Sequence, residues 1–146
     1  MSSSRTWDAL EVAIRRASQS LLGEIKAEKM DGTEVIECEA LVPAWTKGKY
    51  ERGDARTHNG QTWKCVQPHD NAANPDIEPG KSPAQWVPFH TKDPKRAKEF
   101  IQPTMAEDSY NQDEVCIWNG KVYRSKVNGN AYSPEAAPQN WELVEV

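Results

Sequence analysis

The sequence has little of what would mark a membrane or nucleic-acid-binding protein. No apolar stretch approaches the ~20 residues of a membrane span, and residues 1–6 lack the apolar core of a signal peptide. We therefore expect a protein made in a cytoplasm, with no signal peptide and no membrane insertion. Lys and Arg number 18 against 22 Asp and Glu, which argues against a nucleic-acid partner held by a broad basic surface.

Cysteine is also scarce. The three cysteines, Cys38, Cys65 and Cys116, are odd in number and show no CxxC spacing. That count argues against both a disulfide framework and a zinc site, so we expect buried free thiols. The three histidines lie 11 and 21 positions apart, which is no metal-ligand pattern. The sequence thus predicts no metal and no cofactor.

Tryptophan is what the chain has in quantity. Six Trp and four Tyr, against two Phe, supply most of the large apolar surface of its 146 residues. That length suits one ordinary domain or two to three small ones. Since a small module buries little area, each bulky ring contributes more to its core.

Much of the stretch from Trp45 to Trp86 recurs sixty positions later. The pairs without a gap are Tyr50 and Tyr110, Asn59-Gly60 and Asn119-Gly120, and Trp63 and Tyr123. Prolines also stand seven and three residues before both closing tryptophans, Trp86 and Trp141. At the same offset, Met105 stands where Trp45 does. We interpret the repeat as two copies of one small module, the second with a loop shorter by five residues.

Residues 6–30 carry the period of an amphipathic helix, with Thr6 as its expected N-cap. The apolar residues alternate in steps of three and four, as in the seam of a coiled coil. They are Trp7, Leu10, Ile14, Ala17 and Leu21. Two readings stay open: the helix packs on its own chain, or it joins copies into a homo-oligomer, with a trimer as the first guess.

The remaining segments favour short strands. Residues 34–42 alternate loosely and suggest a strand or extended connector. Asn-Gly between residues 54–58 and 61–67, and again between 114–118 and 121–127, predicts two hairpins with type I′ turns. Short closing strands follow around Trp86 and Trp141. The expected fold is mainly β: an N-terminal α-helix followed by two tandem small three-stranded antiparallel β modules.

The first module resembles the chitin-binding modules of carbohydrate-binding families 5 and 12. The resemblance is carried by Ala44-Trp45, Tyr50, Gly53-Asp54, Asn59-Gly60, Trp63-Lys64-Cys65, His69, Pro79 and Trp86. It divides the chain into a helix and connector (1–42), module one (43–90), a linker (91–102) expected to be solvated, and module two (103–146). It implies aromatic side chains that stack on a glycan, with N-acetylglucosamine as a candidate unit.

The resemblance implies carbohydrate-binding candidates at Trp45, Trp63, His69, Trp118 and Tyr132. Core packing competes with this role for Trp45, Trp63 and Trp118, and it is the expected role of Trp86, because a small sheet needs large rings to bury any area. For His69 the competing role is a hydrogen bond that holds its loop. Tyr132, in the loop before Ser133-Pro134, is the candidate expected to be exposed.

The order of helix, module, linker and module looks like that of phage tail-associated proteins. We therefore expect a virion protein, made in the host cytoplasm, that attaches to a bacterial cell-surface glycan and contacts other virion or tail proteins. No acidic pair stands in a catalytic frame, and modules of about 45 residues seldom form deep clefts, so no enzyme is expected. The alternative is a purely structural adaptor or decoration protein whose modules bind other phage proteins.

Overall fold

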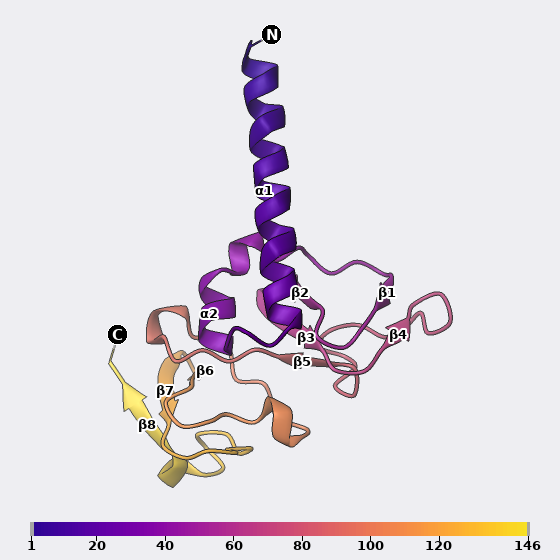
Figure 1. Cartoon of the computed structure of the whole chain (residues 1–146). Helices are drawn as coiled ribbons and strands as arrows, with labels where there is room; N and C mark the ends of the chain where they lie inside the picture. The colour runs from indigo at the N-terminus through magenta and orange to yellow at the C-terminus, as the bar shows by residue number, and fades with distance from the viewer. Residues whose placement is uncertain (1, 146) are drawn as a thin grey trace.

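The computed structural model describes residues 2–145, with side chains described for residues 8–145. A long helix, α1 (Ser2–Lys26), projects from a body of small sheets (Figure 1). A second, short helix, α2 (Gly32–Glu37), packs within that body. The expectation of a mainly β protein with an N-terminal helix and small antiparallel sheets is confirmed.

Three sheets lie within the described residues. The strands are β1 (Lys49–Tyr50), β2 (Ala55–His58), β3 (Gln61–Cys65), β4 (His69–Asp70), β5 (Trp86–Pro88), β6 (Val115–Trp118), β7 (Lys121–Ser125) and β8 (Trp141–Val144). The orders are β2-β3-β5 and β6-β7-β8, with β1 and β4 forming a separate pair. The pair β1–β4 is too short to show a sequence period, so the prediction of two sheets misses it.

Both predicted hairpins are present with the predicted turns. Asn59 and Gly60 have φ of 51° and 77°, and Asn119 and Gly120 have φ of 51° and 76°. A type I′ turn needs positive φ at both central residues, which Asn and Gly adopt at little cost. The turns fix the register of β2 with β3 and of β6 with β7. Below, residues 43–90 are called the first half and residues 91–145 the second half.

A segment before each three-stranded sheet runs parallel to its first strand. In the first half this segment bridges β2 just before Trp45, and in the second half it bridges β6 just before Phe100. Phe100 is therefore the spatial counterpart of Trp45. The prediction that Met105 holds that place is wrong: Met105 begins the 3₁₀ turn Ala106–Asp108. The sixty-residue offset fails here because five extra residues separate Phe100 from the following tyrosine.

The helix prediction is correct in kind and wrong at its ends. Thr6 lies inside α1 and is not its N-cap, and α1 ends at Lys26. The predicted strand over residues 34–42 is instead α2 followed by a 3₁₀ turn. Asp31 and Glu34 form a capping box: the Asp31 carboxylate accepts from the Glu34 N–H at 2.9 Å, and the Glu34 carboxylate from the Asp31 N–H at 3.3 Å. Two satisfied backbone donors start a helix where we expected a strand.

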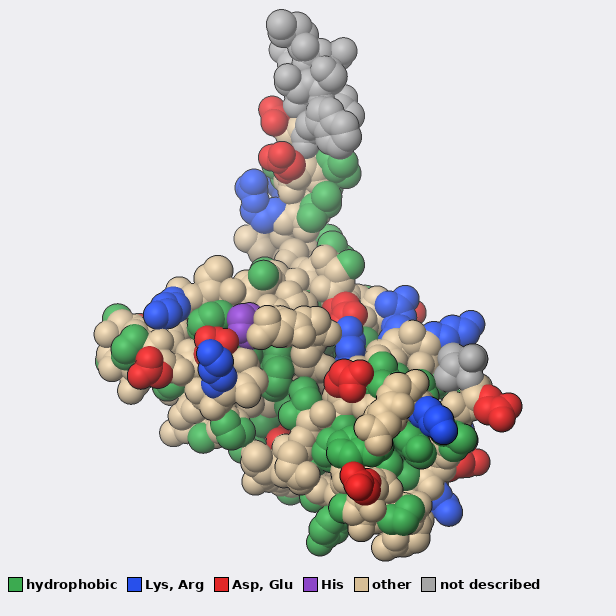
Figure 2. Space-filling model, turned by 180° about the vertical axis from the view of Figure 1, so that it is seen from behind, with side chains coloured by type: hydrophobic (Ala, Val, Ile, Leu, Met, Phe, Trp, Pro, Cys, Tyr) green, Lys and Arg blue, Asp and Glu red, His purple; other side chains and the backbone are tan. Residues whose placement is uncertain are grey.

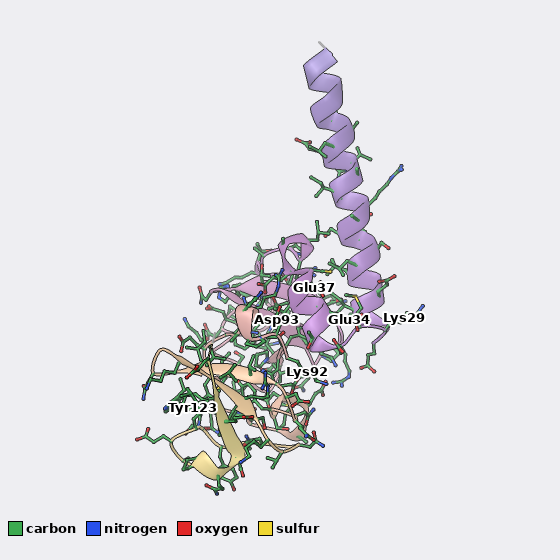
Figure 3. All side chains as sticks on the ribbon, turned by 90° about the vertical axis from the view of Figure 1, so that its left-hand side faces the viewer. Lys29, Glu34, Glu37, Lys92, Asp93 and Tyr123 are labelled. Atoms are coloured by element: carbon green, nitrogen blue, oxygen red, sulfur yellow. The ribbon has the colours of Figure 1, made fainter. Side chains whose placement is uncertain are left out.

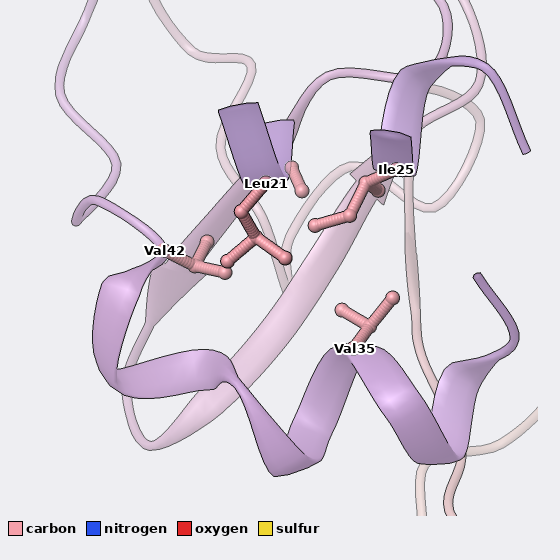
Figure 4. Close-up of a cluster of buried hydrophobic side chains, with 5 residues drawn as sticks. Leu21, Ile25, Val35 and Val42 are labelled. Carbon is pink, nitrogen blue, oxygen red and sulfur yellow. The ribbon is translucent and has the colours of Figure 1, made fainter. Parts of the chain in front are cut away.

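The end of α1 is held by a core between the helices and β2. Leu21 and Ile25 of α1 meet Val35 of α2 and Val42 (Figure 4), and Ala55 of β2 belongs to the same cluster. Each buried Leu, Ile or Val stabilises the fold by about 1.5–3 kcal/mol. From residue 8 to residue 17 the side chains of α1 are exposed. Among the described side chains of α1, contact with the body begins at Ser18, whose hydroxyl donates to the Leu41 carbonyl at 2.8 Å.

The segment 91–102 packs against the body, so the prediction of a solvated, flexible linker is wrong. Thr91 is 1% exposed and bridges β6. The ammonium of Lys98 lies 2.8 Å from a carboxylate oxygen of Glu39, and Lys92 lies beside α2 (Figure 3). This segment therefore packs on α2, on Glu39 and on β6. No helix within residues 2–145 is long and apolar enough to cross a membrane.

Candidate functional site

The first half is built around a cluster of aromatic rings on one face of β2-β3-β5. Trp63 and Trp86 are 6% and 1% exposed and pack with Tyr50 and Cys65. They meet because alternate residues of β3 and β5 point to the same face. These two tryptophans therefore belong to the hydrophobic core, and their rings offer little surface to a ligand.

Trp45 lies at the edge of this cluster and is only half-buried. Its backbone N–H donates to the Thr57 carbonyl at 2.8 Å, which fixes it beside β2. Its ring meets the His58 imidazole edge to face, with centroids 5.1 Å apart. Its indole Nε1 has no hydrogen-bond partner within the described part of the chain. Trp45 thus has a partly accessible ring, while its indole N–H is buried.

Polar groups lie next to Trp45. His58 Nε2 is 3.0 Å from a carboxylate oxygen of Glu78. This hydrogen bond lowers the pKa of Glu78, against a smaller opposing effect of burial. Lys81 lies 3.7 Å from the same carboxylate. The imidazole lies beside the Trp45 ring, and the carboxylate and the ammonium group follow it in series. Such groups can bond to the hydroxyls of a sugar whose apolar face covers the ring.

His69 holds its loop, as its competing role predicts. Its Nδ1 is 2.9 Å from the Gln67 carbonyl oxygen, so we assign the proton to Nδ1. The ring lies 5.7 Å from Tyr50 and 5.6 Å from Trp86. Its Nε2 is buried without a partner among the described residues. His69 therefore belongs to the aromatic cluster and leaves one buried acceptor free.

A shallow groove of about 200 Å³ runs between the two halves. Its first wall contains Trp63, Gly80, Pro83, Trp86 and Pro88, and its second contains Ile101, Gln102, Thr104 and Asp108. The lining is mainly apolar, with the Gln102 amide at its rim. The groove places part of the second half against the rings of the first.

Ion pairs fix this arrangement of the halves. Glu107 lies 3.0 Å from Arg52 and 2.8 Å from Lys64. Burial alone would raise the pKa of Glu107, but the hydrogen bonds from Lys64 and Arg52 outweigh it and hold the pKa below its usual range. The carboxylate is therefore ionised at neutral pH and joins the second half to two points of the first.

The second half has its own aromatic cluster. Tyr110, Cys116 and Trp141 are buried, and Phe100 and Tyr123 pack against them. Trp118, at the end of β6, is half-buried and meets the ring of Phe100 edge to face at 5.5 Å. This pair repeats the contact between Trp45 and His58 at the equivalent position.

Tyr132 is 60% exposed, as expected for its loop. The indole N–H of Trp141 donates to the Tyr132 backbone oxygen at 2.8 Å, so the loop is anchored while the ring stays open. The candidates therefore form two groups: Trp45, Trp63 and His69 in the first half, and Trp118 and Tyr132 in the second. The sequence did not identify Phe100 as part of the second module. The one indication was that an aromatic residue stands inside the segment taken as a linker.

The predicted oligomerisation residues divide along α1. Leu10 and Ile14 are 45% and 49% exposed, Ala17 is exposed, and Leu21 is buried in the core of its own chain. The side chain of Trp7 lies outside those that the structure describes. Apolar groups follow one edge of the projecting helix and charged groups the other (Figure 2). The stripe from Leu10 to Ala17 is free of contacts with the body.

The cysteines are free thiols, and Cys65 and Cys116 are buried as expected, whereas Cys38 is half-buried. Burial raises the pKa of Cys65 to about 11 and that of Cys116 to about 12. Both stay protonated near neutral pH, and a thiol is a poor nucleophile. Among the described side chains, no cluster of three His, Cys, Asp or Glu could hold a metal ion.

These features define a small β module with a cluster of aromatic rings on one face of its sheet. The model of carbohydrate-binding module family 5/12 matches residues 44–87, which contain β1 to β4, Trp45 and most of β5. The match supports carbohydrate binding by the first half. No curated protein matches the chain.

Proposed function

We propose that the chain is a non-catalytic protein of a phage virion, carried at the tail, that attaches to a glycan of the bacterial cell surface. The main support for carbohydrate binding is the family match over residues 44–87. Within that segment, Trp45 offers a half-exposed ring beside His58 and Glu78. The glycan class is a wall polysaccharide or peptidoglycan, with N-acetylglucosamine as the candidate unit.

The second half acts, in this proposal, as a second module of the same kind. The shared strand order and the turns at Asn59 and Asn119 support it. The edge-to-face pair of Phe100 and Trp118 supports it too, because it occupies the place of Trp45 and His58. The module then begins near Lys98, before the boundary that the sequence suggests.

The free stripe of α1 joins copies of the chain, with a trimer as the proposed state. Leu10, Ile14 and Ala17 keep the steps of three and four that bury a seam between helices and are exposed in the single chain. Oligomerisation would combine weak single-site contacts into avidity. The virion assignment rests on this order of parts: a helix free to assemble, followed by sugar-binding modules. Assembly would take place in the host cytoplasm.

Binding to polysaccharide tests the proposal. Full-length protein is mixed with insoluble chitin, purified peptidoglycan and intact cell walls, and the bound fraction is measured after centrifugation. We expect retention on at least one of them and reduced retention for Trp45→Ala and Tyr132→Ala. Thermal unfolding of both variants verifies that they remain folded. Absence of retention on every polysaccharide, for folded wild-type protein, refutes sugar binding.

A structural adaptor is the second candidate, and burial of the rings favours it. Trp63, Trp86 and Trp141 are at most 6% exposed, so half of the six tryptophans serve the core. In that case the modules contact other virion proteins. Specific capture of a tail protein by the chain, together with no retention on any glycan, would establish this second function.

A further inference from the structure

The second sheet carries an open strip of large side chains across its three strands. Tyr123 of β7 lies opposite Cys116 of β6 and Leu143 of β8. Because side chains alternate along a strand, Trp118 points to the same face as Cys116. Trp118, Tyr123 and Leu143 therefore share one face, and below they are called the outer strip. Leu143 is 52% exposed, and the two rings are half-buried.

The outer strip is open because a loop is short. In the first half, the equivalents of Trp118 and Tyr123 are His58 and Trp63. The loop between β3 and β5 covers both: Glu78 bonds to His58 at 3.0 Å, and a side-chain carbon on Gly80 would lie 3.6 Å from the Trp63 ring. The loop between β7 and β8 is five residues shorter.

The rings of the outer strip are held in place by neighbours on the same face of the sheet. Phe100 supports Trp118 edge to face at 5.5 Å, and Tyr123 packs against the buried cluster that contains Trp141. Among side chains of residues 8–145, none bonds to the Trp118 indole N–H or to the Tyr123 hydroxyl at hydrogen-bond distance. Fixed rings with free polar groups bind with little loss of conformational entropy.

We propose that the outer strip is a second sugar-binding surface, distinct from Trp45, that takes a short run of linked pyranose rings. This inference rests on the proposed function. Neighbouring strands lie about 4.8 Å apart, so three strands give a strip roughly 10 Å long. The apolar face of a pyranose covers the rings and Leu143, while the Trp118 N–H and the Tyr123 hydroxyl bond to its hydroxyl or acetamide groups.

The size of the strip favours a sugar over a protein partner. A stable protein interface buries about 800 Å² on each partner. Three side chains, each of about 150–250 Å² at most and two of them already half-buried, expose much less. The strip also ends at Lys121, an exposed cation that can bond to sugar hydroxyls.

Titration of the full chain with a soluble N-acetylglucosamine hexamer tests the proposal. The variants are Trp118→Ala, Tyr123→Ala and Leu143→Glu, each alone and combined with Trp45→Ala. Trp118→Ala and Tyr123→Ala each remove a ring that packs on the sheet, which can disturb the fold. Leu143→Glu changes an exposed position and leaves the fold intact. Val122→Ala, on the opposite face of β7, is the matched control. We expect each outer-strip change to weaken binding at one of two sites about tenfold and to leave the Trp45 site unchanged. Each combination with Trp45→Ala should weaken binding at both sites.

The outcomes separate the two claims. If the three variants bind like wild type while Trp45→Ala loses binding, the outer strip is not a sugar site and the proposed function stands. If Leu143→Glu changes the mass of the protein in solution and not its sugar affinity, the strip is an interface between copies, and the proposal is overturned. If folded wild-type protein binds neither the hexamer nor any wall polysaccharide, the proposed function fails and this inference falls with it.

Discussion

Among single residues, the position along a strand decides which aromatic rings face water. Trp63 and Trp86 point into the face that a long loop covers, and both are buried. Trp45 precedes its strand and lies at the edge of the cluster, so part of its ring stays accessible. The same residue type therefore builds the core at two positions and stays partly accessible at a third.

His90 makes the fold sensitive to acid. Its ring stacks on Tyr110 with centroids 3.7 Å apart, and its Nε2 lies 2.7 Å from the Asp108 carbonyl oxygen. Burial lowers the pKa of His90 from 6.5 to about 4. As the pH falls below 6.5, the unfolded chain takes up this proton first. The free energy of unfolding then decreases by about 3 kcal/mol between pH 6.5 and pH 4.

Urea unfolding of wild type and His90→Phe at several pH values measures this effect. The Phe side chain keeps the stacking on Tyr110 and cannot titrate, so carboxylates shared by both proteins cancel in the difference. We expect the stability of wild type relative to the variant to fall as the pH is lowered from 7 to 4. A difference that stays constant over this range would contradict the assignment of a buried neutral His90.

Between elements, local hydrogen bonds and close contacts decide the start of α2. The capping box of Asp31 and Glu34 overrides the loose alternation that suggests a strand. Asp31→Ala removes the acceptor of the Glu34 N–H and should lower the free energy of unfolding by about 1 kcal/mol. Asp31→Asn keeps an acceptor and should lie close to wild type. Equal denaturant midpoints for Asp31→Ala and wild type would refute the role of the cap.

Gly32, the first residue of α2, lies against the backbone of His90. A side-chain carbon at Gly32 would overlap the His90 carbonyl, so Gly32→Ala must displace α2 from the end of the first half. Gly23 in α1 has nothing near the equivalent position. Gly23→Ala should therefore stabilise the protein by up to about 1 kcal/mol, and Gly32→Ala should destabilise it. Thermal unfolding distinguishes the two, and a change of the same sign in both would contradict this packing.

The sequence predicts elements well where one local signal dominates. Asn-Gly sets both hairpins through positive φ, and α1 follows from its apolar period. At α2 two local signals conflict: Asp31 and Glu34 have the spacing of a capping box, whereas the loose alternation over residues 34–42 suggests a strand. The place of Phe100 was not predictable from the repeat, because an insertion of five residues shifts the offset and only the bridge to β6 reveals the match. Exposure of the outer strip likewise depends on how far a loop reaches.

For the molecule as a whole, one body presents aromatic surfaces and one helix stands free of it. The ion pairs of Glu107 with Arg52 and Lys64 hold the halves together, while the stripe from Leu10 to Ala17 projects away from both (Figure 1). Binding surfaces fixed in relative position on an oligomer are the arrangement from which avidity arises.

The mass in solution tests the role of α1. Ile14→Asp places a charge on the free stripe, and Val12→Asp places one on another side of the same helix, where the side chain is 40% exposed. We expect wild type and Val12→Asp to form the same oligomer and Ile14→Asp to be a monomer, as measured by light scattering. Monomeric wild type at high concentration, or equal masses for both variants, would contradict assembly through this stripe.

The most direct test of sugar binding is to follow the indole N–H signals of the six tryptophans by NMR while an N-acetylglucosamine hexamer is added. The account predicts shifts for Trp45 and Trp118, whose rings are half-buried, and little change for Trp63, Trp86 and Trp141, whose rings are buried. Unchanged signals for Trp45 and Trp118 at saturating hexamer and at saturating soluble wall fragments would contradict it.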